Sequence, residues 1–172
     1  MGQRKSLNLI AIAVWGLALG CGADGDHDAA EQARLRESLQ VWSDLKGSDQ
    51  RQYRYTSLTS SWTGSRGNTT IDVVGDIVVS RAWELFDPDG MQVEAWTEDT
   101  ASLGSHPHGA APLTIDQIYD RCASEVLPKD PAKNWITLTF MENGVLEYCS
   151  YFPNTCADDC SQGFNISSLE LR

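Results

Sequence analysis

The sequence predicts an α+β domain with an antiparallel sheet and two helices, in the order α-β-β-β-β-α-β-β-β. Three observations lead to this class. Apolar residues at helical spacing occur over residues 30–46 and again from Thr114, strand-like runs fall between and after these segments, and short turn sequences join neighbouring runs. The 152 residues that follow position 20 have the length of one domain, so we expect a single core.

The first helix is predicted over residues 30–46. Leu35, Leu39, Trp42 and Leu45 share one face of such a helix, and Gly47 follows as a stop. The preceding residues, 21–30, contain no large apolar side chain after Cys21, which is typical of a flexible tether. We therefore expect the folded domain to cover residues 31–172.

Four strands are expected next, at residues 53–62, 69–74, 77–85 and 91–97. Residues 64–68 form a loop between the first two. Gly75-Asp76 stands between two β-branched runs and predicts a two-residue hairpin turn, because glycine supplies the positive φ that such turns require. Residues 87–90 form the following turn, so the first half reads as a helix followed by an antiparallel meander.

A long connection and a second helix follow. Residues 98–112 have no apolar period and contain glycine and proline, which makes this connection the natural place for an exposed site. Thr114 and Gln117 have capping-box spacing, so a helix begins there. Two strands, 135–142 and 145–152, flank Asn143-Gly144 as a two-residue hairpin, and a last strand over 164–171 closes the domain.

The N-terminus has the order of an export signal. Arg4 and Lys5 precede an apolar run, and the uncharged stretch from Ser6 to Gly20 has 15 residues, whereas a helix that spans a bilayer needs about 20. Residues 1–20 are therefore predicted to be a signal peptide.

Residues 17–21, Leu-Ala-Leu-Gly-Cys, resemble the lipobox of bacterial lipoproteins. Ala18 departs from the commonest pattern, which has leucine three residues before the cysteine. The resemblance implies that Cys21 receives a diacylglyceryl group and becomes the first residue of the mature chain, so that its partner is membrane lipid. Gly22 rather than aspartate after the cysteine implies, again by resemblance, an outer-membrane destination in a cell that has one.

The other four cysteines are an even set in an exported chain, which predicts two disulfides. In a two-residue hairpin Leu138 lies opposite Cys149, so Cys149 points to the core, where the apolar face of the second helix carries Cys122. We therefore expect Cys122 to pair with Cys149 and Cys156 with Cys160. The same register places Glu147 on the inner face, which counts against it.

Charge and motifs limit the function. All 24 acidic residues but only 11 of the 13 basic ones follow position 20, so the mature chain has a net charge of −13 and is a poor partner for nucleic acid. Gly-x-Ser-x-Gly, His-Glu-x-x-His and phosphate-loop sequences are absent, and no cofactor is expected.

Two weak metal candidates remain. His106 and His108 lie in the 98–112 connection without an identifiable third ligand, and Asp158 and Asp159 lack the alternating pattern of a calcium loop. Trp62, Trp83 and Trp96 are candidates for a stacking surface for sugar or peptide, although aromatic residues on strands more often pack in the core.

Residues 31–172 resemble a family of secreted bacterial proteins and lipoproteins of unknown function. The resembling segments are Tyr53-Arg54-Tyr55, residues 73–81 around the Gly75-Asp76 turn, and Thr114-Ile115-Asp116 with Ile118 and Tyr119. The family supplies no established active site to carry over to these residues. We expect a non-catalytic module of the cell envelope that binds another envelope component or protein. The alternative is an envelope hydrolase or metal-dependent enzyme that uses the 98–112 connection.

Overall fold

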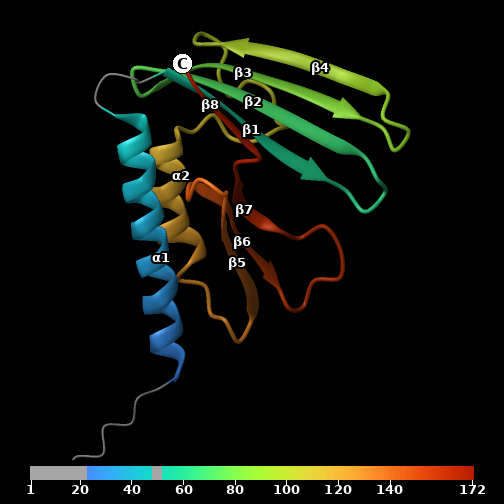
Figure 1. Ribbon diagram of the computed structural model, residues 1–172. Coiled ribbons are helices and arrows are strands. Elements are labelled where there is room, and N and C mark those ends of the chain that lie inside the picture. Colours follow the sequence, from blue (N-terminus) through green and yellow to red (C-terminus); the bar gives the residue numbers. More distant parts are fainter. Residues whose placement is uncertain (1–22, 48–51) are drawn as a thin grey trace, which may run out of the picture.

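The computed structural model of the protein describes residues 23–47 and 52–172. Within these residues, helices pack beside two antiparallel sheets of five and three strands (Figure 1). The predicted α+β class and element order are confirmed. The predicted signal peptide and Cys21 lie outside the described residues. None of the helices in the described ranges is long and apolar enough to cross a membrane.

Helix α1, Ala23–Lys46, starts before the predicted position and so includes residues 23–30, which were expected to form a tether. It packs through Leu35, Ser38 and Trp42, which are buried and share one face because they are three or four residues apart. The Trp42 ring meets Tyr53 edge-on, with centroids 4.9 Å apart. Thus α1 covers the core through a narrow buried stripe that is apolar except for Ser38.

The five-stranded sheet has the order β4-β3-β2-β1-β8. Its strands are β1 (Gln52–Ser60), β2 (Arg66–Val74), β3 (Ile77–Phe86), β4 (Gln92–Asp99) and β8 (Ser168–Leu171). Alternate residues of β1 to β3 are buried, among them Tyr53, Tyr55, Ile71, Val73 and Trp83. The face that carries them is called the inner face below, and the opposite face is the outer face.

The turns of this sheet follow the expected chemistry. Gly75 and Asp76 have φ of 60° and 61°, and Val74 pairs with Ile77, so the predicted two-residue turn is confirmed. Strand β2 begins at Arg66, so residues 66–68 belong to the strand and not to the expected loop.

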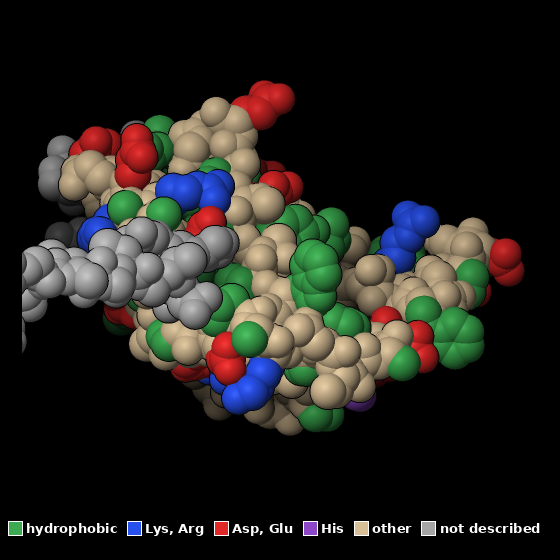
Figure 2. Space-filling model, turned by 90° about the horizontal axis from the view of Figure 1, so that it is seen from below, with side chains coloured by type: hydrophobic (Ala, Val, Ile, Leu, Met, Phe, Trp, Pro, Cys, Tyr) green, Lys and Arg blue, Asp and Glu red, His purple; other side chains and the backbone are tan. Residues whose placement is uncertain are grey.

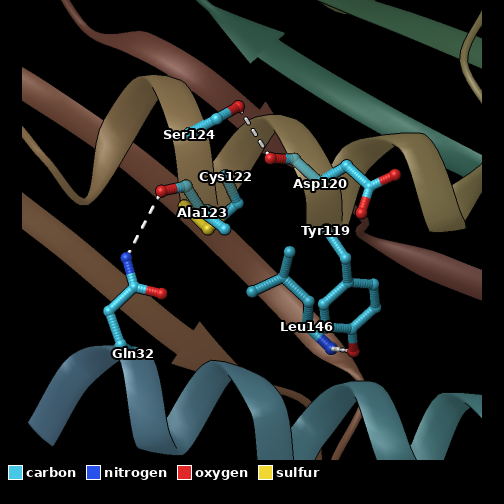
Figure 3. Close-up of a disulfide and its surroundings, with 8 residues drawn as sticks. Gln32, Tyr119, Asp120, Cys122, Ala123, Ser124 and Leu146 are labelled. Atoms are coloured by element: carbon cyan, nitrogen blue, oxygen red, sulfur yellow. Dashed lines mark hydrogen bonds between the residues drawn. A yellow bond between two sulfur atoms is a disulfide. The ribbon is translucent and has the colours of Figure 1, made fainter. Parts of the chain in front are cut away.

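Helix α2, Ile115–Arg121, starts at the predicted capping box. The Thr114 side chain accepts from the Gln117 N–H, and the Gln117 side chain accepts from the Thr114 N–H. The helix continues as a π-helical turn η1, Cys122–Val126. Tyr119 reaches from α2 to the second sheet, where its hydroxyl accepts from the Leu146 N–H at 2.9 Å (Figure 3).

The three-stranded sheet consists of β5 (Asn134–Phe140), β6 (Leu146–Pro153) and β7 (Gln162–Asn165), in the order β5-β6-β7. Leu138 lies opposite Cys149, as predicted. The predicted two-residue turn is wrong, because Met141 pairs with Val145 around Gly144, whose φ is 84°. A bulge after Thr139 compensates for the longer turn and restores the register of Leu138.

The bulge also removes the objection that Glu147 raised. Phe140 lies opposite Leu146, so Glu147 is the extra residue and does not face Phe140. Its backbone oxygen accepts from the Ile166 N–H at 2.8 Å, and its carboxylate accepts from the Thr139 hydroxyl at 3.2 Å. A charged residue therefore stands where the ladder is interrupted.

The predicted last strand is two short strands that belong to different sheets. Strand β7 pairs with β6, the fully buried Ile166 follows, and β8 pairs with β1. Asn165 links the sheets, since its side-chain oxygen accepts from the Leu58 N–H at 2.8 Å and its amide donates to the Leu58 oxygen at 2.9 Å. This side chain takes the place of a neighbouring strand at the edge of β1.

Both expected disulfides are formed. Cys122 pairs with Cys149 between η1 and β6, where both residues are fully buried and their Cα atoms are 5.8 Å apart (Figure 3). Cys156 pairs with Cys160 in the connection between β6 and β7, with Cα atoms 6.3 Å apart. The first bond ties the helical layer to the second sheet, and the second closes a surface loop.

Candidate functional site

A buried ion pair on the inner face anchors the long connection after β4. The Glu98 carboxylate and Arg81 guanidinium form two hydrogen bonds of 2.8 Å, and both side chains are almost completely buried. Glu98 also accepts from the N–H groups of Gly104 and His106, at 2.8 and 2.7 Å. Arg81 donates to the backbone oxygens of His106 and Ala110. The connection is therefore fastened to β3 and β4 by one pair of charges.

Stacked aromatic rings hold the same connection against β3 and β4, in addition to the ion pair. The His106 ring lies on Trp96 with centroids 4.3 Å apart, and His108 lies on Trp83 with centroids 5.7 Å apart. The two tryptophans stack on each other at 5.8 Å, and Arg81 covers the Trp96 ring at 4.7 Å. Trp83 and Trp96 therefore serve the packing of this connection and do not form the exposed stacking surface that was considered.

The geometry of His106 does not form a catalytic triad. A triad needs the nucleophile on one ring nitrogen and the carboxylate on the other. Here the Glu98 oxygen and the Ser105 hydroxyl both approach Nδ1 of His106, at 3.0 and 3.3 Å. The carboxylate is moreover shared with Arg81 and backbone donors. The histidines predicted as candidates thus lie beside a structural ion pair.

The predicted metal candidates are not brought into one cluster. Within residues 23–47 and 52–172, no three His, Cys, Asp or Glu residues converge as a metal site would require. Asp158 and Asp159 lie in the loop that Cys156 and Cys160 close, where Asp159 has a φ of 43° and its carboxylate accepts from the Trp62 N–H at 3.4 Å. Asp159 therefore connects this loop to the turn between β1 and β2.

The buried carboxylate predicts an acid-sensitive fold. Hydrogen bonds from Arg81 and from backbone N–H groups hold the pKa of Glu98 far below its ordinary value. Because the pKa is lowered in the folded chain, the stabilisation is fully present above the unfolded value of about 4.3 and is lost as the pH falls below it. We expect the melting temperature to fall between about pH 5 and pH 3, and this fall to be shallower in Glu98→Gln.

The matched control is Glu125→Gln, on an exposed carboxylate whose pKa is lowered by Arg121. Because water screens that pair, its acid dependence should stay close to that of the unmodified chain. Equal acid slopes in Glu98→Gln and the unmodified chain would contradict the assignment.

Two hollows lie at the junction of the sheets, one on each side of β7. The inner pocket, of about 610 Å³, is bounded by β1, α2, η1, β6 and β7. Its apolar floor includes Tyr55, Leu113 and Ile118. Both aromatic rings at its rim are covered by cations, because Arg121 lies over Phe164 at 5.1 Å and Lys129 over Tyr151 at 4.6 Å.

The outer pocket, of about 520 Å³, lies between the far ends of β1 and β2 and the strands β6 and β7. Seen from below, the end of the five-stranded sheet that lies away from the helices projects from the rest of the molecule, and an indentation separates this projection from the rest (Figure 2). The lining residues are Leu58, Thr59, Ser60, Arg66, Asn68, Tyr148, Ser150, Asp159, Ser161, Gly163, Phe164 and Asn165. Both pockets have the size of ordinary small-molecule sites.

Sequence reasoning found Asp159 but missed the rest of this pocket. Leu58 and Asn68 lie directly opposite each other, as do Ser60 and Arg66, so the four side chains share the outer face. Their strands were recognised, but the partner surface comes from β6 and β7, and only the tertiary fold brings it near. The one available signal was the polar character of residues 59–68 on a strand pair.

No family model matches this sequence, and neither a curated protein nor a solved structure matches it. The resemblance to a family of unknown function therefore stays a prediction, and the site rests on its own geometry.

Proposed function

We propose that this chain is an exported bacterial lipoprotein whose domain is a non-catalytic binding module of the cell envelope. The observation that carries the proposal is the division among the five cysteines. The four in the described residues pair as two disulfides, which suits an oxidising compartment, and Cys21 is left at the end of a signal-like segment. Lipid on Cys21 would hold the domain at a membrane, and Gly22 after the cysteine favours the outer membrane in a cell that has one.

The binding role rests on the junction of the sheets. Both pockets there are lined by side chains from several elements, and neither contains a nucleophile, base and carboxylate in series. The alternative of an enzyme that uses His106 and His108 draws no support from the connection, since both rings stack on tryptophan and Glu98 is engaged by Arg81. The acidic surface favours a partner other than nucleic acid.

Mass spectrometry of the N-terminus tests the anchor. We expect a mature chain that begins at Cys21 and carries a diacylglyceryl group, and we expect Cys21→Ser to lose the lipid and to leave the membrane fraction. Each buried acyl CH₂ contributes about 0.8 kcal/mol, so loss of the chains should release the domain almost completely. A chain that keeps residues 1–20 without lipid, or a Cys21→Ser variant that still sediments with membranes, would refute the proposal.

A further inference from the structure

The outer pocket has a lining that differs from the inner pocket in two respects, its hydrogen-bonding groups and its uncovered aromatic surface. Arg66 offers only donors and Asp159 only acceptors, while the hydroxyls of Ser150 and Ser161 offer both. Among the described residues Arg66 has no acidic partner within ion-pair distance. A ligand there meets one charge of each sign and several neutral polar groups.

The presence of one positive and one negative side chain in the lining limits the charge that a ligand can carry. A carboxylate or phosphate would face Asp159 and the acidic surface of a chain with net charge −11, and a cation would face Arg66. A neutral molecule with many hydroxyls meets neither repulsion, and each hydroxyl both donates and accepts hydrogen bonds. The lining therefore fits a neutral polyhydroxylated ligand.

Aromatic surface completes the pocket. Tyr148 lies on the wall formed by β6 and is 38% exposed, and no ring or cation among the described residues stacks on it. Trp62 is 78% exposed, and its backbone N–H contacts Asp159 of the pocket lining. Amphipathic rings of this kind offer an apolar face together with a polar edge. In the inner pocket, by contrast, Lys129 covers the Tyr151 ring, while Arg121 covers Phe164, a ring that lines both pockets.

The edge of β1 argues against an extended peptide as the ligand. The Ser61 N–H donates to Ser65 across the hairpin, so the backbone groups of Leu58 and Ser60 point outward. Asn165 occupies those of Leu58, and Asp159 accepts from the outward N–H of Trp62. Only Ser60 is left between them, whereas a peptide that adds as a strand needs a row of backbone partners.

We propose that the outer pocket binds a neutral saccharide, with Tyr148 as a stacking platform and Arg66 and Asp159 as hydrogen-bonding partners of its hydroxyls. This inference rests on the proposed binding role, to which it adds the class of ligand.

The test uses the full chain in a detergent that contains no sugar. Tetrasaccharides of N-acetylglucosamine, of β-linked glucose and of α-linked glucose are titrated by calorimetry and by saturation-transfer NMR. We expect at least one to bind in the millimolar range or tighter. Tyr148→Ala should weaken it by about tenfold and Tyr148→Phe by less than about threefold, because phenylalanine keeps the ring. Arg66→Ala should weaken it by about fivefold.

Lys129→Ala, in the inner pocket, is the matched control and should leave the affinity unchanged. Melting curves of each variant separate a lost contact from a lost fold. The inference is overturned if none of the three saccharides binds at about 10 mM. It is also overturned if Tyr148→Ala and Arg66→Ala both bind the saccharide as tightly as the unmodified chain does. It is also overturned if a capped peptide of alternating valine and threonine binds there and the saccharides do not. None of these outcomes alters the lipid on Cys21, so the two proposals fail separately.

Discussion

Glu98→Gln is expected to lower the melting temperature at pH 7 by about 10 °C. The substitution keeps the shape of the side chain but removes its charge, which leaves the buried Arg81 guanidinium without a counter-ion. Breaking a buried pair on one side is far more costly than breaking a surface pair, and each kcal/mol moves the melting temperature by about 2–4 °C in a domain of this size. Circular dichroism against temperature measures the change.

Two variants make this result specific. Glu125→Gln disrupts the exposed pair with Arg121 and should move the melting temperature by no more than about 2 °C. Glu98→Leu combined with Arg81→Met removes both charges together and should recover part of the loss. No unpaired ion then stays buried, although backbone groups of Gly104, His106 and Ala110 lose their side-chain partners. If Glu98→Gln is no more harmful than Glu125→Gln, the pair does not anchor the connection.

Removal of the Cys122–Cys149 bond is expected to cost about 3.5 kcal/mol of unfolding free energy. Its half-cystines are 27 residues apart, and the loss of chain entropy in the unfolded state grows with the length of the closed loop. The double variant Cys122→Ala with Cys149→Ala avoids free thiols that could pair wrongly. Urea unfolding of the oxidised chain and of this variant gives the difference.

The second disulfide provides the control. Cys156 and Cys160 are only 4 residues apart, so the same relation gives about 2 kcal/mol for their removal. The buried bond should therefore be the more important of the two. An equal or reversed order would show that loop length does not determine their contributions, and that local packing around the surface loop does.

Features that depend on neighbouring residues could be predicted from the sequence. The capping box of Thr114 and Gln117 and the Gly75-Asp76 turn need only local backbone chemistry, and both were correct. The pairing of Cys122 with Cys149 was also correct, since the face of a helix and the register of a hairpin follow from spacing. The longer turn around Gly144 escaped prediction because its bulge returned the strands to the same register.

The candidate site could be predicted only in fragments, because it depends on contacts between distant segments. In the sequence Arg81 looks like an ordinary strand residue and Glu98 like the first residue of the 98–112 connection, yet their mutual burial fixes the path of the residues that follow. Likewise nothing in the local sequence around Asn165 indicates that its amide substitutes for a strand beside Leu58. Alternation predicts that a residue faces one side of a strand, but not what lies opposite.

The split of the C-terminal segment has a consequence for the order of assembly. Strand β8 and the residues before it close the edge of β1, and the Ser167–Thr56 contact joins positions 111 residues apart. In a chain that is delivered N-terminus first, one edge of β1 therefore stays unpaired until residues 162–172 have been delivered and can fold against it. Such high contact order slows folding and leaves the partly delivered chain prone to mispairing. Residues 162–171 therefore complete both sheets, because β7 pairs with β6 and β8 pairs with β1.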